Sequence, residues 1–561
     1  YAVLALPYLM EFPHECAEQV FNRYYANALA RHIARSDPKI RRIFDLWKAT
    51  PALDSPLEKN PELKAVALEE SPWLQQAQSE SQARRNVGVL FDDNRLEAEL
   101  AAALDKLRET RRADGGWAWF PGGPRDDYIT LYIVTGFGRL RHLGVDAPVD
   151  LAVEALDAVD RWVRERHREI LEHASQPEEH VPGALEALYL YGRSFFLRDK
   201  PLAPETQTAV DFFLARARAH WLKTGSRQTQ GHLALALQRF GDPATAQAIA
   251  RSLKERSVTG EELGRFWRDP APSWWWYHAP LETHALMMEV LAEIAQDAAA
   301  LEECQVWLLK QKQTQHWKST KATADAVYAL LLRGRNLLSS DALVGVMLGD
   351  LDLTPGAEPR PGPGLPRPAV EPGTGFYEVR LPGTAVRPEW STITVRKTDP
   401  GVAWGSVHWQ YFEDLSRIPP FAETPLQLTK RLFVRRFTAR GPVLEAVTGP
   451  VAVGDELVVR LELRVDRDME YVHLKDARGS GTEPVNVLSG YRDQDGLGYY
   501  ETTRDTASHF FIGWLPRGTY VFEYPVRVQL RGEYQTGPAS IQCLYAPEFN
   551  SHSESFKLVV R

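Results

Sequence analysis

Apolar residues recur at helical spacing through the first 335 residues, and short breaks containing glycine or proline separate one periodic segment from the next. Many helices of about 15 residues joined by short loops are typical of an all-α array. The periodic segments are 95–110, 128–143, 150–165, 183–197, 206–222, 231–240, 282–296 and 321–333. The sequence therefore predicts an all-α region from residue 1 to about residue 335.

Two turns that contain a tryptophan resemble one another within this region. In the first, Leu107 lies in a helical segment, Trp117 lies in a glycine-rich turn, and Thr130 follows at the start of the next segment. The second repeats this order with Trp317 and Thr323. A helix, a turn with a tryptophan and a helix entered through a threonine are similar to the repeating pair of an α/α toroid, in which inner and outer helices alternate around a barrel. We therefore expect an α/α toroid here.

The pattern changes to a β-type pattern after the helical region. Residues 355–375 are rich in proline and glycine, which is typical of a loop, and strand-like runs flank them. A few strands cannot close a sandwich alone, so 336–425 is predicted to be part of a β-domain. Within 426–561, the run 456–465 alternates mostly apolar and polar residues, as a half-buried strand does. Several such runs separated by turns predict a β-sandwich, and the fold class is multidomain, all-α followed by all-β.

Cys16 and Gln19 are candidate reactive residues at the start of the chain. Residues three apart share one face of a helix, so a cysteine thiolate can meet a glutamine amide, displace ammonia and leave an internal thioester. Pro13, Glu15 and Glu18 suit a helix N-terminus, where a cysteine pKa is lowered. The spacing alone is common, and a buried cysteine is usually a small apolar residue. The longer segment around it adds the decisive pattern.

Residues 13–19, followed by residues 21–27, closely resemble the thioester segment of bacterial α2-macroglobulins. Human α2-macroglobulin and the complement components carry a Gly-Cys-Gly-Glu-Gln version of this segment. Here Glu15 and Ala17 occupy the two glycine positions, whereas the cysteine, glutamate and glutamine positions all match. This chain therefore departs from the animal pattern and resembles the bacterial one.

The resemblance implies three domains. It assigns 1–335 to a thioester-containing α/α toroid and 336–425, with its loop at 355–375, to the C-terminal part of a split CUB-like β-domain. It assigns 426–561 to a macroglobulin-like β-sandwich that is similar to the receptor-binding domain of animal members. Further matching segments are 276–283 and 307–331, at the last turns of the toroid, and 543–553, in the last strands of the sandwich.

The resemblance also implies a function, that of a broad-range protease inhibitor. In this family a protease cuts a bait region, which would lie upstream of this chain, and a change of shape exposes the thioester. A lysine amine of the protease then attacks the Gln19 carbonyl, and Cys16 becomes a free thiol. This is single-turnover acyl transfer with no metal or cofactor, so we expect no enzyme.

The start of the chain, which lacks a methionine and a basic region, leads us to expect the C-terminal piece of a longer protein. An export signal or lipid anchor would then lie upstream, and the resemblance implies a periplasmic or extracellular location. Membrane contact is expected only through such an anchor, since no apolar run is long enough to span a bilayer.

A thioester hydrolyses in water, so its surroundings should keep it dry. Phe12, four residues before Cys16, is a candidate shield because some bacterial members have a tyrosine there, and Tyr24 is a second candidate. Ordinary helix packing is the alternative for Tyr24. His180 and, as second choice, His278 are candidates for a histidine that takes over the acyl group. Either is more often a surface or capping histidine, so we expect direct transfer to amines.

Composition excludes several classes of function. A net charge of −8 gives no basic face for nucleic acid. Three cysteines in 561 residues exclude a disulfide framework, and Cys304 and Cys543 are predicted to be buried thiols. No cysteine or histidine pairs have zinc-site spacing, so we expect no metal.

Three alternatives remain open. One is an adhesin or envelope protein that couples its thioester to surface amines. Another is an isoprenoid cyclase-like α/α-barrel enzyme, although Asp92-Asp93 and Asp126-Asp127 lack the Asp-x-Asp-Asp pattern of such enzymes. A cysteine protease, with Cys16 as nucleophile and His14 as base, is not among these alternatives, because the two residues fit no known order in such enzymes. The third alternative is a structural module in which the thioester never forms or is already hydrolysed.

Overall fold

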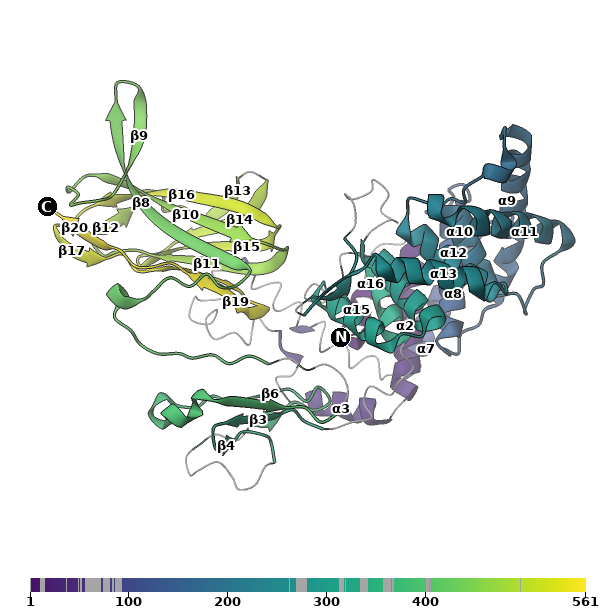
Figure 1. Ribbon diagram of the computed structural model, residues 1–561, viewed down its shortest axis with the longest axis horizontal. Coiled ribbons are helices and arrows are strands. Elements are labelled where there is room, and N and C mark those ends of the chain that lie inside the picture. The colour runs from purple at the N-terminus through teal and green to yellow at the C-terminus, as the bar shows by residue number, and fades with distance from the viewer. Residues whose placement is uncertain are drawn as a thin grey trace. The chain divides into compact units, whose positions relative to one another are not determined.

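A computed structural model gives the fold of the chain (Figure 1). It describes residues 2–10, 16–36, 38–48, 50, 53–55, 72–73, 81–82, 85, 93–261, 263–268, 280–311, 317, 319–332, 342–356, 365, 368–399, 403, 405–494 and 496–561. Contacts divide the chain into two compact units. Unit 1 comprises Tyr1–Leu53, Gln82–Val379 and Thr392–Gly401, and unit 2 comprises Asp54–Ser81, Arg380–Ser391 and Val402–Arg561.

Unit 1 is mainly helical, as the sequence predicts. Its described helices are α1 (Ala2–Met10), α2 (Ala17–Ser36), α3 (Pro38–Lys48), α7 (Asp93–Thr110), α8 (Asp127–His142), α9 (Asp150–His173), α10 (Ala184–Ser194), α11 (Pro204–His220), α12 (Arg227–Arg239), α13 (Pro243–Glu255), α14 (Pro280–Val290), α15 (Ala298–Lys310) and α16 (Thr320–Leu331). Short 3-10 turns are η4 (Pro177–Glu179) and η5 (Trp221–Lys223), and a π-helical turn, η7 (Leu291–Ala295), extends α14. No helix in the described ranges combines the length and the hydropathy needed to cross a membrane.

The helices form a closed ring. Helices α2, α8, α10, α12, α14 and α16 contact one another in that order, and α16 returns to contact α2. Other helices cover them from outside: α7 packs on α2, α9 on α8, α13 on α12 and α15 on α14. Every residue of α16 from Thr320 to Ala329 is buried, because an inner helix has neighbours on all sides. This arrangement is the predicted α/α toroid.

The two predicted tryptophan turns have the same hydrogen bonds. In each, the indole Nε1–H donates to a carbonyl of the preceding helix, and the tryptophan amide donates to a threonine hydroxyl of the following helix. The pairs are Trp117 Nε1 to Leu107 O (2.9 Å) and Trp117 N to Thr130 Oγ1 (3.0 Å), then Trp317 Nε1 to Leu308 O (2.8 Å) and Trp317 N to Thr323 Oγ1 (3.0 Å). Trp267 makes the same indole bond to Leu253 O (2.7 Å), a repeat that the sequence reading missed.

Small sheets accompany the toroid within unit 1. Strands β1 (Val258–Gly260) and β2 (Gly264–Phe266) form a hairpin. Strands β4 (Leu351–Asp352), β3 (Gly345–Leu348) and β7 (Ile393–Arg396) lie in that order in an antiparallel sheet, and β5 (Ala369–Val370) pairs with β6 (Tyr377–Glu378). Strand β5 falls inside the segment 355–375 that the sequence predicts as a loop. The predicted domain limits at 335 and 425 stay predictions.

Unit 2 contains the predicted all-β region. Its strands are β8 (Leu426–Thr438), β9 (Gly441–Ala446), β10 (Glu456–Val465), β11 (Met469–Ala477), β12 (Thr482–Pro484), β13 (Gly490–Gln494), β14 (Leu497–Thr503), β15 (Ala507–Leu515), β16 (Gly518–Val528), β17 (Gly532–Gln535), β18 (Ala539–Cys543), β19 (Ala546–His552) and β20 (Lys557–Val560). One sheet has the order β12-β16-β10-β8-β9 and the other β13-β14-β15-β11-β18-β19, while β17 pairs with β20. Three short 3-10 turns, η8 (Gly383–Ala385), η9 (Pro388–Ser391) and η10 (Leu415–Arg417), precede the sheets.

The alternation predicted for 456–465 is that of strand β10. Leu457, Val459, Leu461 and Leu463 are buried in the core between the sheets, at every second position. The sandwich core also holds residues of the second sheet, such as Phe510. The all-α then all-β order of the chain is therefore confirmed.

A buried ion pair joins the two sheets of this sandwich. Lys430 of β8 donates to Asp476 Oδ1 of β11 (2.6 Å), and both side chains are at most 1% exposed. The same ammonium donates to the carbonyls of Ala477 (2.9 Å) and Gly537 (3.1 Å), so it has three acceptors. The Tyr524 hydroxyl donates to the other carboxylate oxygen of Asp476. Charges buried this deeply are tolerated because each is hydrogen-bonded and neutralised by the other.

Candidate thioester site

Cys16 lies at the N-terminus of α2, an inner helix of the toroid. Its carbonyl accepts hydrogen bonds from Gln19 N (3.0 Å) and Val20 N (3.0 Å), the first bonds of the helix. The residue is 9% exposed. Burial raises the pKa of the thiol, while the backbone N–H groups of Gln19 and Glu18 act in the opposite direction. The helix start therefore favours the thiolate, but burial outweighs it and keeps a proton on the sulfur.

Gln19 lies about one helical turn after Cys16, on the same face of α2. Its carbonyl oxygen Oε1 is buried and has no hydrogen-bond partner among the described residues. Leaving a buried acceptor without a donor costs about 1–3 kcal/mol. The structure thus holds an amide carbonyl oxygen out of water one helical turn after a buried thiol. Pro13 and Phe12, which the sequence places around this site, lie outside the described residues.

Glu18 links the start of α2 to the start of α16, the helix that closes the ring. Its Oε1 accepts hydrogen bonds from Asn22 Nδ2 (2.6 Å) and from Thr320 Oγ1 (2.8 Å) at the first residue of α16. Its Oε2 accepts from the Cys16 thiol, with an S···O distance of 3.9 Å. Burial is the largest influence on the pKa of Glu18 and raises it, against the lowering effects of the Thr320 and Asn22 hydrogen bonds. The sequence placed Glu18 at the helix start and at the glutamate position of the thioester segment, but it could not reveal a hydrogen-bond partner 302 residues away.

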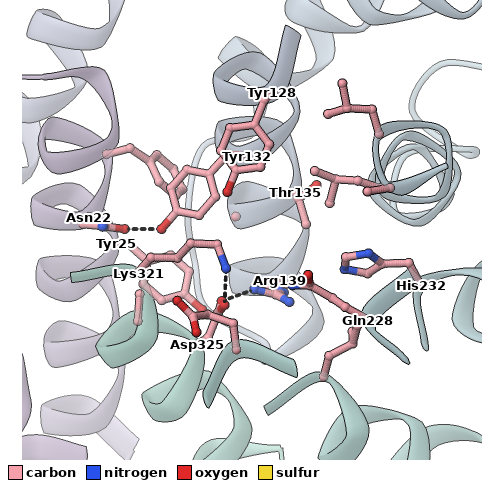
Figure 2. A pocket seen from close by; sticks show the side chains of 18 of the residues that line it. Asn22, Tyr25, Tyr128, Tyr132, Thr135, Arg139, Gln228, His232, Lys321 and Asp325 are labelled. Atoms are coloured by element: carbon pink, nitrogen blue, oxygen red, sulfur yellow. Dashed lines mark hydrogen bonds and ion pairs between the residues drawn. The ribbon is translucent and has the colours of Figure 1, made fainter. Parts of the chain in front are cut away.

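The loop between α7 and α8 contacts the same helix start. Ala17 N–H donates to the carbonyl of Trp119 (2.9 Å). The Trp119 ring stacks on Tyr128, which stacks on Tyr132. The Tyr132 hydroxyl donates to Asn22 Oδ1 (2.7 Å), as Figure 2 shows. The loop therefore fixes the backbone next to Cys16, and Tyr132 of α8 fixes the Asn22 side chain that holds Glu18.

Tyr24, predicted as a shield, is a core residue of α2. It is 1% exposed, and its ring contacts those of Phe21 and Phe137. Burial raises the pKa of its hydroxyl. These contacts are the ordinary helix packing that the sequence offered as the alternative. A shielding role for Tyr24 stays a prediction, as it does for Phe12.

His180 lies just before α10, and its partners are those of a helix start. Its Nε2 is 3.2 Å from Glu186 Oε2, and this carboxylate also accepts from the Gly183 amide. Its ring contacts Phe212 and Phe213. This is the capping arrangement named as the alternative to acyl transfer. His278 lies outside the described residues, so a transfer role for either histidine stays a prediction.

The centre of the toroid contains a small cavity (Figure 2). Its volume is about 50 Å³, enough for water but far below the roughly 300–1,000 Å³ of a typical ligand pocket. Asp325 in its wall accepts from Lys321 Nζ (3.0 Å) and from Arg139. Together these two cations hold the pKa of Asp325 below its ordinary value, although burial alone would raise it. The cavity gives no support to an isoprenoid-binding enzyme.

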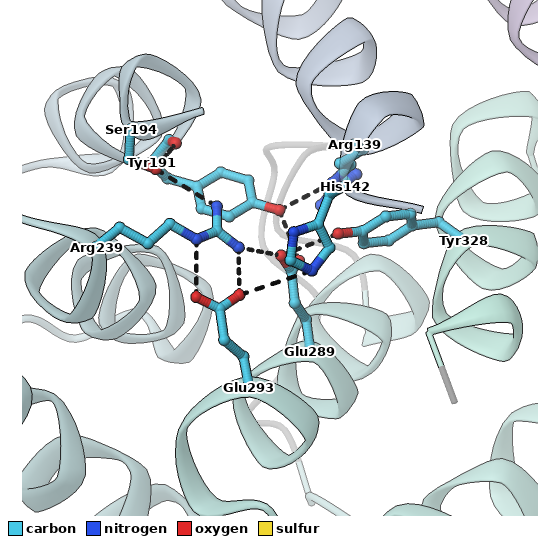
Figure 3. A network of polar contacts seen from close by, with 8 residues as sticks. All are labelled: Arg139, His142, Tyr191, Ser194, Arg239, Glu289, Glu293 and Tyr328. Atoms are coloured by element: carbon cyan, nitrogen blue, oxygen red, sulfur yellow. Dashed lines mark hydrogen bonds and ion pairs between the residues drawn. The ribbon is translucent and has the colours of Figure 1, made fainter. Parts of the chain in front are cut away.

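Carboxylates near this cavity are already neutralised by arginine (Figure 3). Glu289 and Glu293, with His142, have ligand atoms close enough to hold a metal ion. The Arg239 guanidinium lies between the two carboxylates, at 2.8 Å from Glu289 Oε1 and 2.9 Å from Glu293 Oε1. Tyr191 also donates to Glu289 (2.6 Å). An arginine therefore supplies the positive charge that a metal would bring, and the group does not indicate a metal centre.

Comparisons with known proteins agree with this architecture. A family model described as the bacterial alpha-2-macroglobulin MG10 domain matches residues 426–548, within the sandwich. An alpha-2-macroglobulin homolog from a Nostoc species is 22% identical over 509 residues, covering 84% of this chain and 24% of the homolog. Circularly permutated Ras protein 2 of Dictyostelium discoideum is 26% identical over 110 residues, or 20% of this chain and 3% of that protein.

Solved structures of Escherichia coli alpha-2-macroglobulin are also similar. The trypsin-activated form is 13% identical with a TM-score of 0.42, covering 84% of this chain and 30% of that one. This chain spans about a quarter of the length of the Nostoc homolog and a much smaller share of the Ras protein. The match of the sandwich to a family-specific domain and the alignment along most of the chain show that this chain is similar to the C-terminal region of bacterial alpha-2-macroglobulins.

Proposed function

We propose that this chain is the thioester-bearing part of a protease inhibitor of the α2-macroglobulin type. The observation that carries the proposal lies at the start of α2. A buried Cys16 thiol lies on the helix N-terminus, and one turn further a Gln19 carbonyl oxygen is buried without a donor among the residues that the structure describes. A thioester between them replaces the amide nitrogen by sulfur and leaves an acyl group that amines attack. The similarity to bacterial alpha-2-macroglobulins and the toroid around the pair support the same proposal.

The proposed sequence of events follows from that bond. A protease cuts a bait region outside this chain, and the resulting change of shape exposes the Cys16–Gln19 bond. A lysine amine of the protease attacks the Gln19 carbonyl carbon, an amide forms, and Cys16 leaves as a thiol. Each molecule reacts once, so the chain is an inhibitor and not an enzyme. We place this reaction in the periplasm or outside the cell, as defence against foreign proteases.

Intact mass with and without methylamine tests the proposal. The native chain should be lighter than its translated sequence by one ammonia, and methylamine should add its own mass while one thiol becomes titratable. The Cys16→Ser variant is the matched control and should show neither change. A native wild-type chain that has its full translated mass and does not react with methylamine refutes the covalent step.

A thioester adhesin is the second candidate, because the same pair of residues would serve it. Incubation with an active protease and with a lysine-rich protein that is not a protease separates the two functions. An inhibitor should form a covalent product only after proteolysis of the full-length protein, whereas an adhesin should couple to both.

A further inference from the structure

Glu18 is the only acidic side chain in the described part of the site that contacts the Cys16 thiol. One of its oxygens, Oε1, is held by Asn22 and Thr320, so the carboxylate cannot rotate freely. The other, Oε2, accepts from the thiol at 3.9 Å. The residue is 7% exposed, so water competes little for that oxygen. Fixation by two donors and a free edge that faces sulfur are what a general base requires.

A base is needed because the thiol is buried and protonated. The thiolate, and not the thiol, is the nucleophile, and burial raises the pKa of Cys16. Burial also raises the pKa of Glu18, so this carboxylate accepts a proton more readily than an exposed one. The amide nitrogen of Gln19 is also a poor leaving group unless it receives a proton. One group that takes the proton from sulfur and gives it to nitrogen meets both needs.

We infer that Glu18 is the proton carrier that forms the thioester, an inference that rests on the proposed function. Glu18 Oε2 takes the proton from Cys16 Sγ, and sulfur attacks Gln19 Cδ. The Sγ–Cδ bond forms and the Cδ–Nε2 bond breaks. The nitrogen takes the proton from Glu18 and leaves as ammonia, so thiol and amide become thioester and ammonia, and Glu18 ends as a carboxylate. Asn22 and Thr320 are positioning residues in this step.

Ammonia makes the reaction measurable in the folded chain. Ammonia is the leaving group of the forward reaction. Excess ammonia therefore drives the reverse reaction, which opens the thioester and restores the Gln19 amide. After rapid desalting, intact mass follows the loss of one ammonia with time. Glu18→Gln keeps an oxygen that accepts from Asn22 and Thr320 but cannot carry a proton. Thr320→Val is the matched control, since it removes one bond to Oε1 and leaves the carboxylate in place.

We expect Glu18→Gln to close the thioester at least about a hundredfold more slowly than wild type, the lower range for loss of a general acid–base group. Its rate should rise about tenfold per pH unit, because solvent must then remove the thiol proton. Wild type should instead show a plateau that bends downward at acid pH as Glu18 protonates. Thr320→Val should keep that bend. Because ionised Glu18 is buried at a cost, Glu18→Gln should melt no lower than wild type at pH 7.

A folded Glu18→Gln chain that closes at the wild-type rate overturns the inference, although the proposed function would stand. If Glu18→Gln fails to fold, the wild-type pH profile decides: a rate that rises tenfold per pH unit from pH 5 to 8 without a bend also overturns it. A wild-type chain that never loses ammonia refutes the proposed function itself, and the inference with it.

Discussion

The buried Lys430–Asp476 pair allows a quantitative test of how the C-terminal sandwich is held together. Replacing Lys430 by methionine keeps the length of the side chain but removes the cation that bonds the Asp476 carboxylate, which keeps the Tyr524 hydroxyl as donor and the charge of Arg478 nearby. Breaking a buried pair by removing one partner costs about 3–5 kcal/mol, because one charge stays buried and uncompensated. Replacing both residues, as Lys430→Met with Asp476→Leu, should cost little or stabilise by about 1–4 kcal/mol.

Hydrogen exchange of the full chain, read by mass spectrometry on peptides from β8 and β11, measures this locally. A loss of 3–5 kcal/mol raises exchange through opening of the sandwich by about a hundredfold to a few thousandfold. Burial already raises the pKa of Asp476, and loss of Lys430 should raise it further. A raised carboxyl pKa lowers the free energy of unfolding as the pH rises through that pKa. The stability that Lys430→Met loses relative to wild type should therefore become smaller as the pH is lowered.

Two results would refute this reasoning. One is a double variant whose cost equals the sum of the two single costs, since the charges would then not depend on each other. The other is a deficit of Lys430→Met that stays constant between pH 8 and pH 5. Peptides from the toroid serve as the internal control and should exchange at the same rate in all variants.

Three further predictions concern the toroid. Trp317→Phe removes the indole bond to Leu308 O and should destabilise unit 1 by about 1–3 kcal/mol, measured as faster exchange in α15 and α16; wild-type exchange rates would contradict it. Burial lowers the pKa of His284, in α14, from 6.5 to about 4. The stability that depends on its neutral form, about 3 kcal/mol, is therefore fully present above pH 6.5 and is lost as the pH falls toward 4. Thermal melts of a His284→Gln chain should lack this pH dependence. Phe12→Ala should speed loss of the thioester in free-thiol titrations, and an unchanged decay would count against a shielding role.

The sequence predicts those features of the fold that depend on local periodicity. Helical spacing and the Trp117 and Trp317 turns identified the toroid because each of these patterns extends over only about 25 residues of sequence. The repeat at Trp267 was missed because Thr283, which holds the same place in α14 as Thr130 in α8 and Thr323 in α16, lies further along the chain from its tryptophan than the other two do. Alternation in 456–465 predicted which face of β10 is buried, since side chains of a strand alternate between faces.

Contacts between distant residues could not be read in the same way. The sequence suggested Cys16 and Gln19 because they are neighbours on one turn of helix. It could not show that Glu18 bonds Thr320, or that Lys430 meets Asp476 across two sheets, since either pair depends on how separate elements pack. Periodicity identifies a buried face, but it does not identify the polar residue on another element that will satisfy a charge there.

Closure of the toroid by α16 against α2 has a consequence for how the molecule is made. The hydroxyl that anchors Glu18 follows it by 302 residues, and translation at about 5–20 residues per second needs roughly 15–60 s to supply them. During that interval the nascent chain carries its cysteine and glutamine on a helix whose carboxylate is not yet fixed. If Glu18 forms the thioester as we propose, completion of the ring is what activates the acyl group, and an unfinished polypeptide on the ribosome carries no thioester with which to react with its neighbours.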